Sequence, residues 1–238
     1  MDKIVIREDI PQYMQELKKW LAETEDTPLE EMDSFFARRI DLYEEHMAVW
    51  QAAYAYAAEF VPETAETLLD IGCGTGLELA GIFVRLPKIQ VTGIDLSKAM
   101  LEQMKKKYAG KAVTAICADY FQADFGESYF DAAISFETLH HFPPEKKQML
   151  WSKLYAALKP GGIYIHADYL ACCPEEEELL FCACAKKRRR DGIGEDVFVH
   201  FDTPLTAEHE IQLLENAGFS DVRFACCIHG ASILIMRK

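Results

Sequence analysis

Two stretches with helical spacing of apolar residues occupy the N-terminal quarter of the chain. Between Ile10 and Ala22 apolar side chains recur every three or four positions, which predicts an amphipathic helix. Residues Phe35 to Phe60 form a longer run rich in Ala, Tyr and Glu without Gly or Pro, and Pro62 closes it. We therefore expect residues 1–62 to form a helical segment.

From Thr67 onward the pattern changes to short apolar runs that alternate with helical segments. The expected strands are Thr67–Ile71, Gln90–Ile94, Ala112–Cys117, Phe130–Phe136 and Ile163–Ala167. The expected helices are Gly76–Leu86, a segment from a Ser97 cap to Tyr108, and Pro144–Leu158, which is stopped by Lys159-Pro160-Gly161-Gly162. Strands and helices that alternate at this spacing predict parallel βαβ units and an α/β fold.

The segment Cys172–Asp202 interrupts this alternation. Acids follow Pro174 and bases precede Asp191-Gly192, a charge order that complements the dipole of one helix. We interpret the basic run Lys186–Arg190 as the solvated end of that helix. The remaining elements are a helix with its stop at Gly218 and a closing strand pair: Thr206–Asn216, Val222–Cys227 and Ala231–Met236.

The composition is that of a folded, strongly acidic protein. Among 238 residues, 25 Lys and Arg stand against 39 Asp and Glu, so the formal net charge is −14. Such a surface repels phosphate backbones, which disfavours nucleic acid as a partner. The apolar runs are too short to span a bilayer and the charged N-terminus lacks a signal-peptide pattern, so we expect a cytoplasmic protein without a membrane partner.

The eight cysteines offer no clear metal-binding pattern. The pairs Cys172-Cys173 and Cys226-Cys227, with Cys182 and Cys184, lack the Cys-x-x-Cys spacing of zinc sites. We interpret them as reduced packing thiols and predict no metal site. Participation of thiols in metalloid methylation remains the alternative.

A glycine-rich turn carries the main chemical signal. Leu68-Leu69-Asp70-Ile71-Gly72-Cys73-Gly74-Thr75-Gly76 joins a buried strand to a helix, so the glycines leave bare backbone where α/β sheets bind ligands. Leu77 stands where dinucleotide-binding proteins need a third glycine, and no Lys-Ser/Thr pair follows for a P-loop. These two features argue against a nicotinamide-dependent oxidoreductase and exclude a P-loop nucleotide site.

Acidic residues follow the next two strands. Asp95 ends the second strand, 19 residues after Gly76, where a carboxylate can accept both hydroxyls of an adenosine ribose or cap a helix. Asp119 follows the third strand in Cys117-Ala118-Asp119-Tyr120, where it can accept the adenine amino group or stabilise a turn. The fourth strand leads into Glu137-Thr138-Leu139-His140-His141-Phe142.

This ordered set of motifs, over about Thr67 to Asp168, resembles class I S-adenosylmethionine-dependent methyltransferases, especially the small-molecule branch that includes the ubiquinone-biosynthesis type. The resemblance implies a doubly wound, mostly parallel seven-stranded sheet, and S-adenosylmethionine as cofactor with S-adenosylhomocysteine as product. It implies a catalytic core at 63–238, an N-terminal helical lid at 1–62 and a lid insertion at 170–205. The implied cofactor-binding residues are Asp70, Gly72, Cys73, Gly74, Gly76, Asp95, Leu96, Ala118, Asp119 and Phe136, with Arg39 and Tyr43 from the lid.

The lid residues have a second interpretation, because Phe36, Tyr43 and Met47 also fit a core-facing helical stripe.

Methyl transfer needs a base only when the acceptor atom carries a proton. Candidate bases are His140, His141, His166 and Glu137, and we expect His140 or His141 to face the acceptor. A packing or capping role for either histidine is the alternative.

The function that the sequence favours is methyl transfer to an unidentified small molecule at oxygen, carbon or nitrogen. A non-catalytic cofactor-binding protein and an RNA or protein methyltransferase are the alternatives, and a homodimer is left open.

Overall fold

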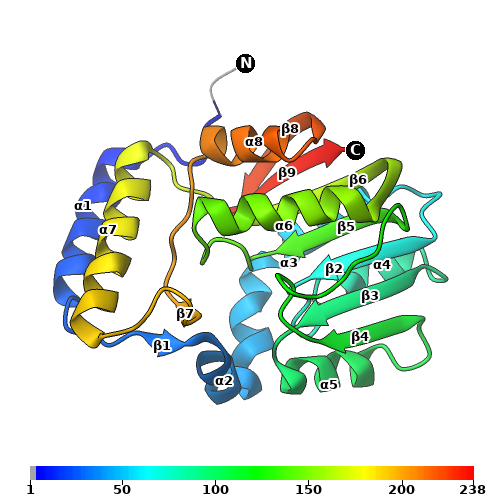
Figure 1. Cartoon of the computed structure of the whole chain (residues 1–238), viewed down its shortest axis with the longest axis horizontal. Helices are drawn as coiled ribbons and strands as arrows, with labels where there is room; N and C mark the ends of the chain where they lie inside the picture. The colour runs from blue at the N-terminus through cyan, green and yellow to red at the C-terminus, as the bar shows by residue number, and fades with distance from the viewer. Residues whose placement is uncertain (1–3) are drawn as a thin grey trace.

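The computed structural model describes residues 4–238 and is built around a seven-stranded sheet (Figure 1). Its strands stand in the order β4-β3-β2-β5-β6-β9-β8, and β9 runs antiparallel to both of its neighbours. The strand bounds are β2 Thr67–Ile71, β3 Gln90–Asp95, β4 Val113–Cys117, β5 Phe130–Phe136, β6 Leu158–Tyr169, β8 Ser220–Ile228 and β9 Ala231–Arg237. The predicted mostly parallel α/β sheet with an antiparallel last strand is confirmed.

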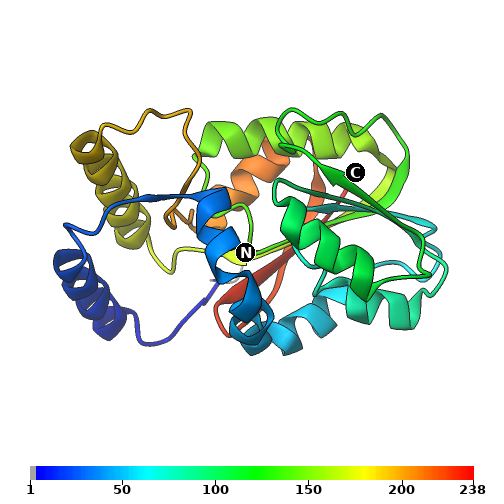
Figure 2. The same ribbon diagram turned by 90° about the horizontal axis from the view of Figure 1, so that it is seen from below.

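Helices cover both faces of the sheet (Figures 1 and 2). One face carries α3 Gln51–Glu59, α4 Leu79–Arg85 and α5 Lys98–Lys107, and the other carries α6 Pro144–Ala157 and α8 Ala207–Asn216. Successive strand residues therefore enter different cores: Leu68 packs under α3 and α4, whereas Leu69 packs under α6. Burial on both faces explains why all five residues of β2 are buried, rather than every second one.

Two of the predicted helices differ from the structure. The long run Phe35–Phe60 divides into α2 Met32–Met47, a 3₁₀ turn η1 Ala48–Trp50 and α3. Trp50 at this break donates its indole N–H to the carbonyl of His229, 3.0 Å away, and α2 leaves the sheet there. The helix α4 begins at Leu79, because Gly76 has φ of +72° and cannot be helical.

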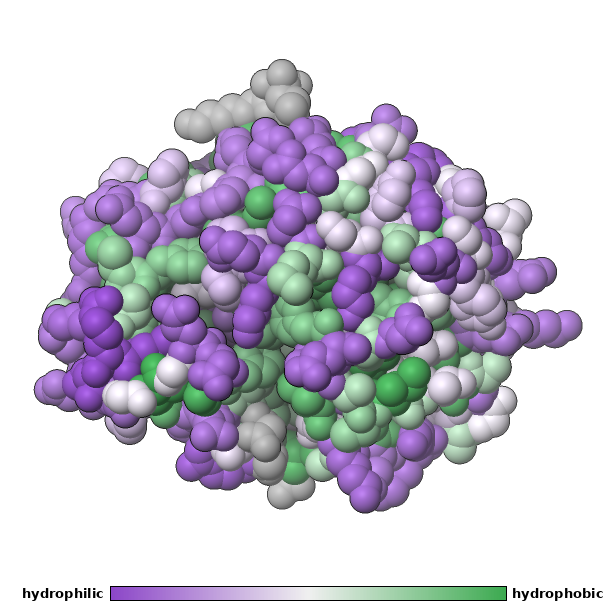
Figure 3. Space-filling model, in the orientation of Figure 1, coloured by the Kyte–Doolittle hydropathy of each residue, from purple (hydrophilic) through white to green (hydrophobic). Residues whose placement is uncertain are grey.

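The N-terminal segment and the segment Cys172–Asp202 form one unit beside the sheet. Helix α1 Ile10–Glu23 packs on α7 Pro174–Asp191 through Met14, Leu17 and Leu180, and β1 Glu30–Glu31 pairs with β7 Val199–His200. The unit lies beyond the carboxyl ends of the parallel strands (Figure 1). Apolar surface gathers between this unit and the sheet (Figure 3).

Among the helices of residues 4–238, none combines the length and apolar character that crossing a bilayer requires.

A fully buried ion pair joins the two helices of one face. Lys147 of α6 donates to Glu210 of α8, and both side chains are 0% exposed. His166 of β6 lies on its inner side, with Nε2 3.6 Å from Glu210 Oε2. Water cannot reach any of these groups, so each charge depends on its partner.

We expect Lys147→Met to lower the free energy of unfolding by about 3–5 kcal/mol, because it leaves the Glu210 charge buried without its partner. The double variant Lys147→Met/Glu210→Leu removes both charges and should recover most of that loss. Urea denaturation of the two variants and the unchanged protein measures the difference. A single variant as stable as the unchanged protein would contradict this account.

Candidate active site

The glycine turn after β2 adopts the backbone that its sequence requires. Gly72, Gly74 and Gly76 have φ values of +68°, +47° and +72°. A Cβ at Gly72 would lie 2.7 Å from Cβ of Thr138, which follows β5. This turn is therefore restricted to glycine both by its left-handed backbone and by the close approach of a neighbouring loop.

Gly72→Ala should therefore destabilise the protein and abolish binding of S-adenosylhomocysteine, the ligand that the sequence leads us to expect at this turn. The matched control is Gly110→Ala, because Gly110 also has a left-handed φ of +87° but has no atom within 4 Å of its Cβ position. The control should lose only about 1–2 kcal/mol from backbone strain. Thermal denaturation with and without S-adenosylhomocysteine separates the two effects, and equal losses in both variants would count against a steric role.

Asp95 connects the glycine turn to the next helix. The Gly74 N–H donates to its Oδ2 at 2.9 Å, and the Ser97 N–H donates to its Oδ1 at 2.7 Å. Burial raises the pKa of this carboxyl, and the two backbone donors oppose that rise. Each oxygen keeps a further lone pair, so Asp95 can still accept hydroxyl donors.

A first cavity lies over this turn and contains about 70 Å³ of free space. It is lined by six of the predicted cofactor residues, namely Tyr43, Gly72, Gly74, Asp95, Leu96 and Phe136. The lining residues that the sequence did not single out for the cofactor are Met32, Phe36, Ser97, Met100, Tyr120, Glu137, Thr138, His141 and Phe198. Tyr43 narrows the space, since its hydroxyl lies 3.3 Å from the Cβ position of Gly74.

The other predicted cofactor residues lie outside this lining. Asp70 is fully buried beside Glu78, and Cys73 packs against Gly93. Asp119 accepts the Phe121 N–H at 2.8 Å, as in its alternative role within a turn. The remaining three are Gly76, Ala118 and Arg39.

A second cavity of about 450 Å³ adjoins the first. It lies between α2 and the loops after β5 and β7, and it is lined by Phe35, Phe36, Arg39, Tyr43, His46, Met47, Trp50, Glu137, His140, His141, Tyr169, His200, Asp202 and Gly230. Four residues line both cavities, namely Phe36, Tyr43, Glu137 and His141. The two spaces therefore share a wall at the carboxyl end of β5.

Comparison with known proteins identifies the domain that carries these cavities. Residues 68–162 match the model of a methyltransferase domain. The carboxy-S-adenosyl-L-methionine synthase of Trichodesmium erythraeum is 28% identical over 83% of this chain and 81% of its own length. The O-methyltransferase cnsE of Penicillium expansum is 30% identical over 66% of this chain. The match covers 53% of that relative's length. Residues 68–162 therefore form a methyltransferase domain, and the seven-stranded sheet has the Rossmann-like fold of class I S-adenosylmethionine-dependent methyltransferases.

A solved structure has the same fold as this methyltransferase. Human N-acetylserotonin methyltransferase in complex with S-adenosylmethionine superimposes with a TM-score of 0.65 at 20% identity, over 92% of this chain and 62% of that one. The relatives named here do not include one of the ubiquinone-biosynthesis type, so that finer resemblance stays a prediction.

The polar groups of the first cavity fit S-adenosylmethionine, the cofactor of this methyltransferase. Gly72 and Gly74 line this cavity with left-handed backbone, beside the side chains of Thr138 and Tyr43, and Asp95 presents a carboxyl at the end of β3. These are the features with which Rossmann-like folds hold an adenosyl ribose and its attached chain.

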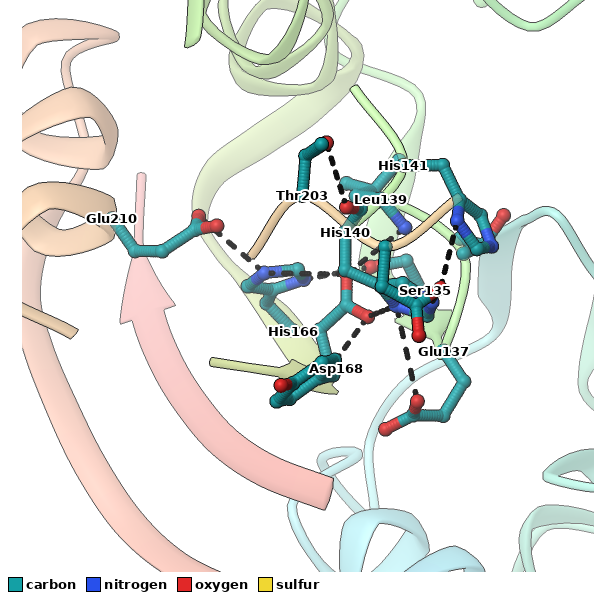
Figure 4. A network of polar contacts seen from close by, with 12 residues as sticks. Ser135, Glu137, Leu139, His140, His141, His166, Asp168, Thr203 and Glu210 are labelled. Atoms are coloured by element: carbon teal, nitrogen blue, oxygen red, sulfur yellow. Dashed lines mark hydrogen bonds and ion pairs between the residues drawn. The ribbon is translucent and has the colours of Figure 1, made fainter. Parts of the chain in front are cut away.

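His140 of the methyltransferase forms an ion pair with Asp168 (Figure 4). Its Nδ1 contacts Oδ1 of Asp168, whose Oδ2 accepts the Leu139 N–H at 2.9 Å. Burial opposes protonation of the imidazole, but attraction to Asp168 outweighs it and raises the pKa of His140 to about 9. His140 is therefore charged at neutral pH and has no lone pair available for a proton.

His141 has the opposite electrostatic environment. Burial lowers its pKa, and repulsion from His140 adds to that effect against the attraction of Asp202. Its Nδ1 lies 3.3 Å from the carbonyl of Phe201 and 3.3 Å from Oδ1 of Asp202. When Nδ1–H donates to these acceptors, Nε2 of a neutral His141 carries a free lone pair.

The two remaining candidate bases differ in position. Glu137 lines both cavities, and its buried Oε1 has no hydrogen-bond partner among the described residues. Burial raises its pKa to about 8, although the charge of His140 opposes this. His166 is fully buried behind Asp168, where Nδ1 lies 3.1 Å from Ser135 Oγ, and it lines neither cavity (Figure 4).

Three side chains of the second cavity have the spacing of metal ligands. His140, His141 and Asp202 bring one ligand atom each to within 4.8 Å of one another. Each already has a hydrogen-bond or ion-pair partner in this cluster. The expectation of no metal site stays a prediction.

Sequence reasoning missed the contribution of β7 and the loop after it. Phe198, His200 and Asp202 reach the cavities from a segment that the sequence treated only as an insertion. The short run of β-branched and aromatic residues Val197-Phe198-Val199 is a weak strand signal that could have indicated β7.

Proposed function

We propose that this methyltransferase methylates a small molecule that binds in the second cavity. The observation that supports this proposal is the wall shared by the two cavities, because a donor in one and an acceptor in the other would meet at Glu137 and His141. A cavity of about 450 Å³ falls within the range of small-molecule sites, roughly 300–1,000 Å³.

We assign the cofactor to the first cavity. Asp95 accepts the ribose hydroxyls, Gly72 and Gly74 lie along the methionine part, and Leu96 and Phe136 contact the adenosyl group. Asp70, Cys73 and Gly76 shape the turn from behind, and Ala118 and Asp119 border the adenine. Arg39 is assigned to the second cavity instead, because its guanidinium lies there.

S-adenosylmethionine supplies a methyl group activated by a sulfonium. The chain orients the acceptor and excludes water, which together account for most of the rate in such displacements. His141 Nε2 accepts the acceptor's proton when there is one, and Asp202 and the Phe201 carbonyl hold the imidazole through Nδ1. His140 and Asp168 form an ion pair beside His141.

We further propose that α2 and the α1–α7 unit, which lie within the predicted lid segments 1–62 and 170–205, act as a lid on the core at 63–238, whereas α3, also within 1–62, packs on the sheet. The first cavity is too small for the cofactor while Tyr43 lies over Gly74. Binding therefore requires α2 to move outward, and β1 paired with β7 links that movement to the α1–α7 unit.

The test is release of S-adenosylhomocysteine when the purified protein is given S-adenosylmethionine and a fractionated metabolite extract. Activity should reside in the fraction of low molecular mass. Turnover confined to an RNA or protein fraction, or cofactor binding without any turnover, would overturn the proposal.

A further inference from the structure

The second cavity contains one arginine, and its guanidinium is already bonded. The Arg39 guanidinium donates from Nη1 to Glu30 Oε2 at 3.2 Å and to the Phe35 carbonyl at 3.1 Å, and it lies 3.8 Å from the centre of the Phe35 ring. Glu30 also pairs with Arg38 at 2.6 Å, so the two arginines share one carboxylate. His140 is paired with Asp168, so each of these two cations of the cavity wall already has a carboxylate partner.

Two acidic groups of the same cavity can accept further donors. Oδ1 of Asp202 lies 3.3 Å from His141 Nδ1 and 3.6 Å from His140 Nε2, and these histidines hold the pKa of Asp202 below the usual range against the effect of burial, while 44% of its side chain is exposed. Glu137 presents an oxygen, Oε1, that is buried and has no hydrogen-bond donor among the described residues, and burial raises the pKa of this carboxyl to about 8. An ammonium group would donate to both side chains and would favour the ionised form of Glu137.

The uncharged part of the cavity wall is largely aromatic. Phe35, Phe36, Tyr43, Trp50 and Tyr169 line it, and the Tyr169 hydroxyl is already bonded to Tyr13 at 2.8 Å. Aromatic faces attract organic cations through their quadrupoles. The net charge of −14 adds a long-range field that favours the approach of cations.

We infer that the acceptor is an organic amine, bound as its ammonium between Asp202, Glu137 and the aromatic wall, and methylated at nitrogen. This inference rests on the proposed function, because it specifies what the second cavity binds. The ammonium loses one proton to His141 Nε2, and the nitrogen lone pair bonds the methyl carbon as the carbon–sulfur bond breaks. The products are a methylated ammonium, S-adenosylhomocysteine and protonated His141, so the two positive charges of the ammonium and the sulfonium are conserved.

The neutral state of His141 is what makes this step feasible. An ammonium has no lone pair and cannot attack until it is deprotonated, so a base with a free lone pair must lie at the wall between donor and acceptor. His141 is the histidine that lines both cavities. A bound ammonium would also increase the tendency of Glu137 to ionise, which strengthens the binding of the cation.

Three ligands of matched shape test the inference on protein saturated with S-adenosylhomocysteine. They are phenethylamine, 2-phenylethanol and 3-phenylpropionate, and ligand-observed NMR measures the three affinities. Phenethylamine should bind about tenfold more tightly than the carboxylate, as expected for one charged hydrogen bond. Asp202→Asn should remove most of this preference, whereas Asp196→Asn, an exposed residue outside both cavities, should retain it.

The inference is overturned if the carboxylate binds as tightly as the amine, if Asp202→Asn keeps the full preference, or if phenethylamine does not bind at millimolar concentration. Titration of S-adenosylhomocysteine alone separates this result from failure of the proposed function. Protein that binds S-adenosylhomocysteine without preferring amines refutes only the acceptor class. Protein that does not bind S-adenosylhomocysteine refutes the assignment of the first cavity.

Discussion

Replacing Asp95 with alanine is expected to weaken binding of S-adenosylhomocysteine on the order of 100-fold or more, since two hydroxyl hydrogen bonds to one carboxylate are lost. The same carboxyl holds the backbone N–H groups of Gly74 and Ser97. Its removal therefore also loosens the glycine turn against which the ligand lies. Isothermal titration calorimetry measures the change directly.

Two further variants test whether the loss of affinity is specific to the Asp95 carboxylate. Asp95→Asn keeps one side-chain oxygen, replaces the other with an amide nitrogen and removes the charge. It should bind S-adenosylhomocysteine with intermediate affinity. Asp124→Ala removes an acid that only accepts the Gly126 N–H in an exposed loop, and it should bind normally. If Asp95→Ala retained full affinity with an unchanged melting temperature, the ribose would not lie at Asp95.

His141→Ala is expected to lower turnover by about 10²–10⁴-fold, the usual contribution of a positioned base, while S-adenosylhomocysteine affinity changes little. The loss should appear in kcat with any protonated acceptor, because the alanine variant leaves the proton in place. Turnover is measured as S-adenosylhomocysteine released. Wild-type turnover in this variant would show that His141 is not the base.

The pH dependence distinguishes His141 from its neighbour. A base works in its neutral form, and burial with repulsion from His140 lowers the pKa of His141 below the ordinary 6.5. Its contribution should therefore be complete at neutral pH and fall only under more acidic conditions. His140, whose pKa is raised to about 9, would instead give activity that rises through that pH. A kcat profile from pH 5 to 10 decides between the two.

Elements defined by local sequence were predictable. The bounds of β2 and β5 match the predicted runs Thr67–Ile71 and Phe130–Phe136, because strands buried on both faces are mostly apolar and lie between polar loops. The Ser97 cap was also predicted, and its hydroxyl accepts the Met100 N–H as a helix N-cap does. The glycine turn and Asp95 were predictable for the same reason, since each directly follows a strand that the local sequence pattern predicts.

Elements that depend on distant contacts were not predictable. His141 meets Phe201 across 60 positions, and Glu30 pairs with His200 across 170, so nothing within either segment indicates the other. The break between α2 and α3 is a similar case, since Trp50 finds its acceptor on His229. Local pattern therefore predicted the cofactor side of the site better than the acceptor side.

Phe36 and Tyr43 place α2 in the wall of both cavities, and this has a kinetic consequence. In the proposed lid, the donor would enter only once Tyr43 has moved away from Gly74, and the acceptor's cavity would lack one side while α2 is displaced. Under this proposal the two substrates would not load in random order. The geometry favours a sequential mechanism in which the donor arrives first, the acceptor second, and the spent donor departs last.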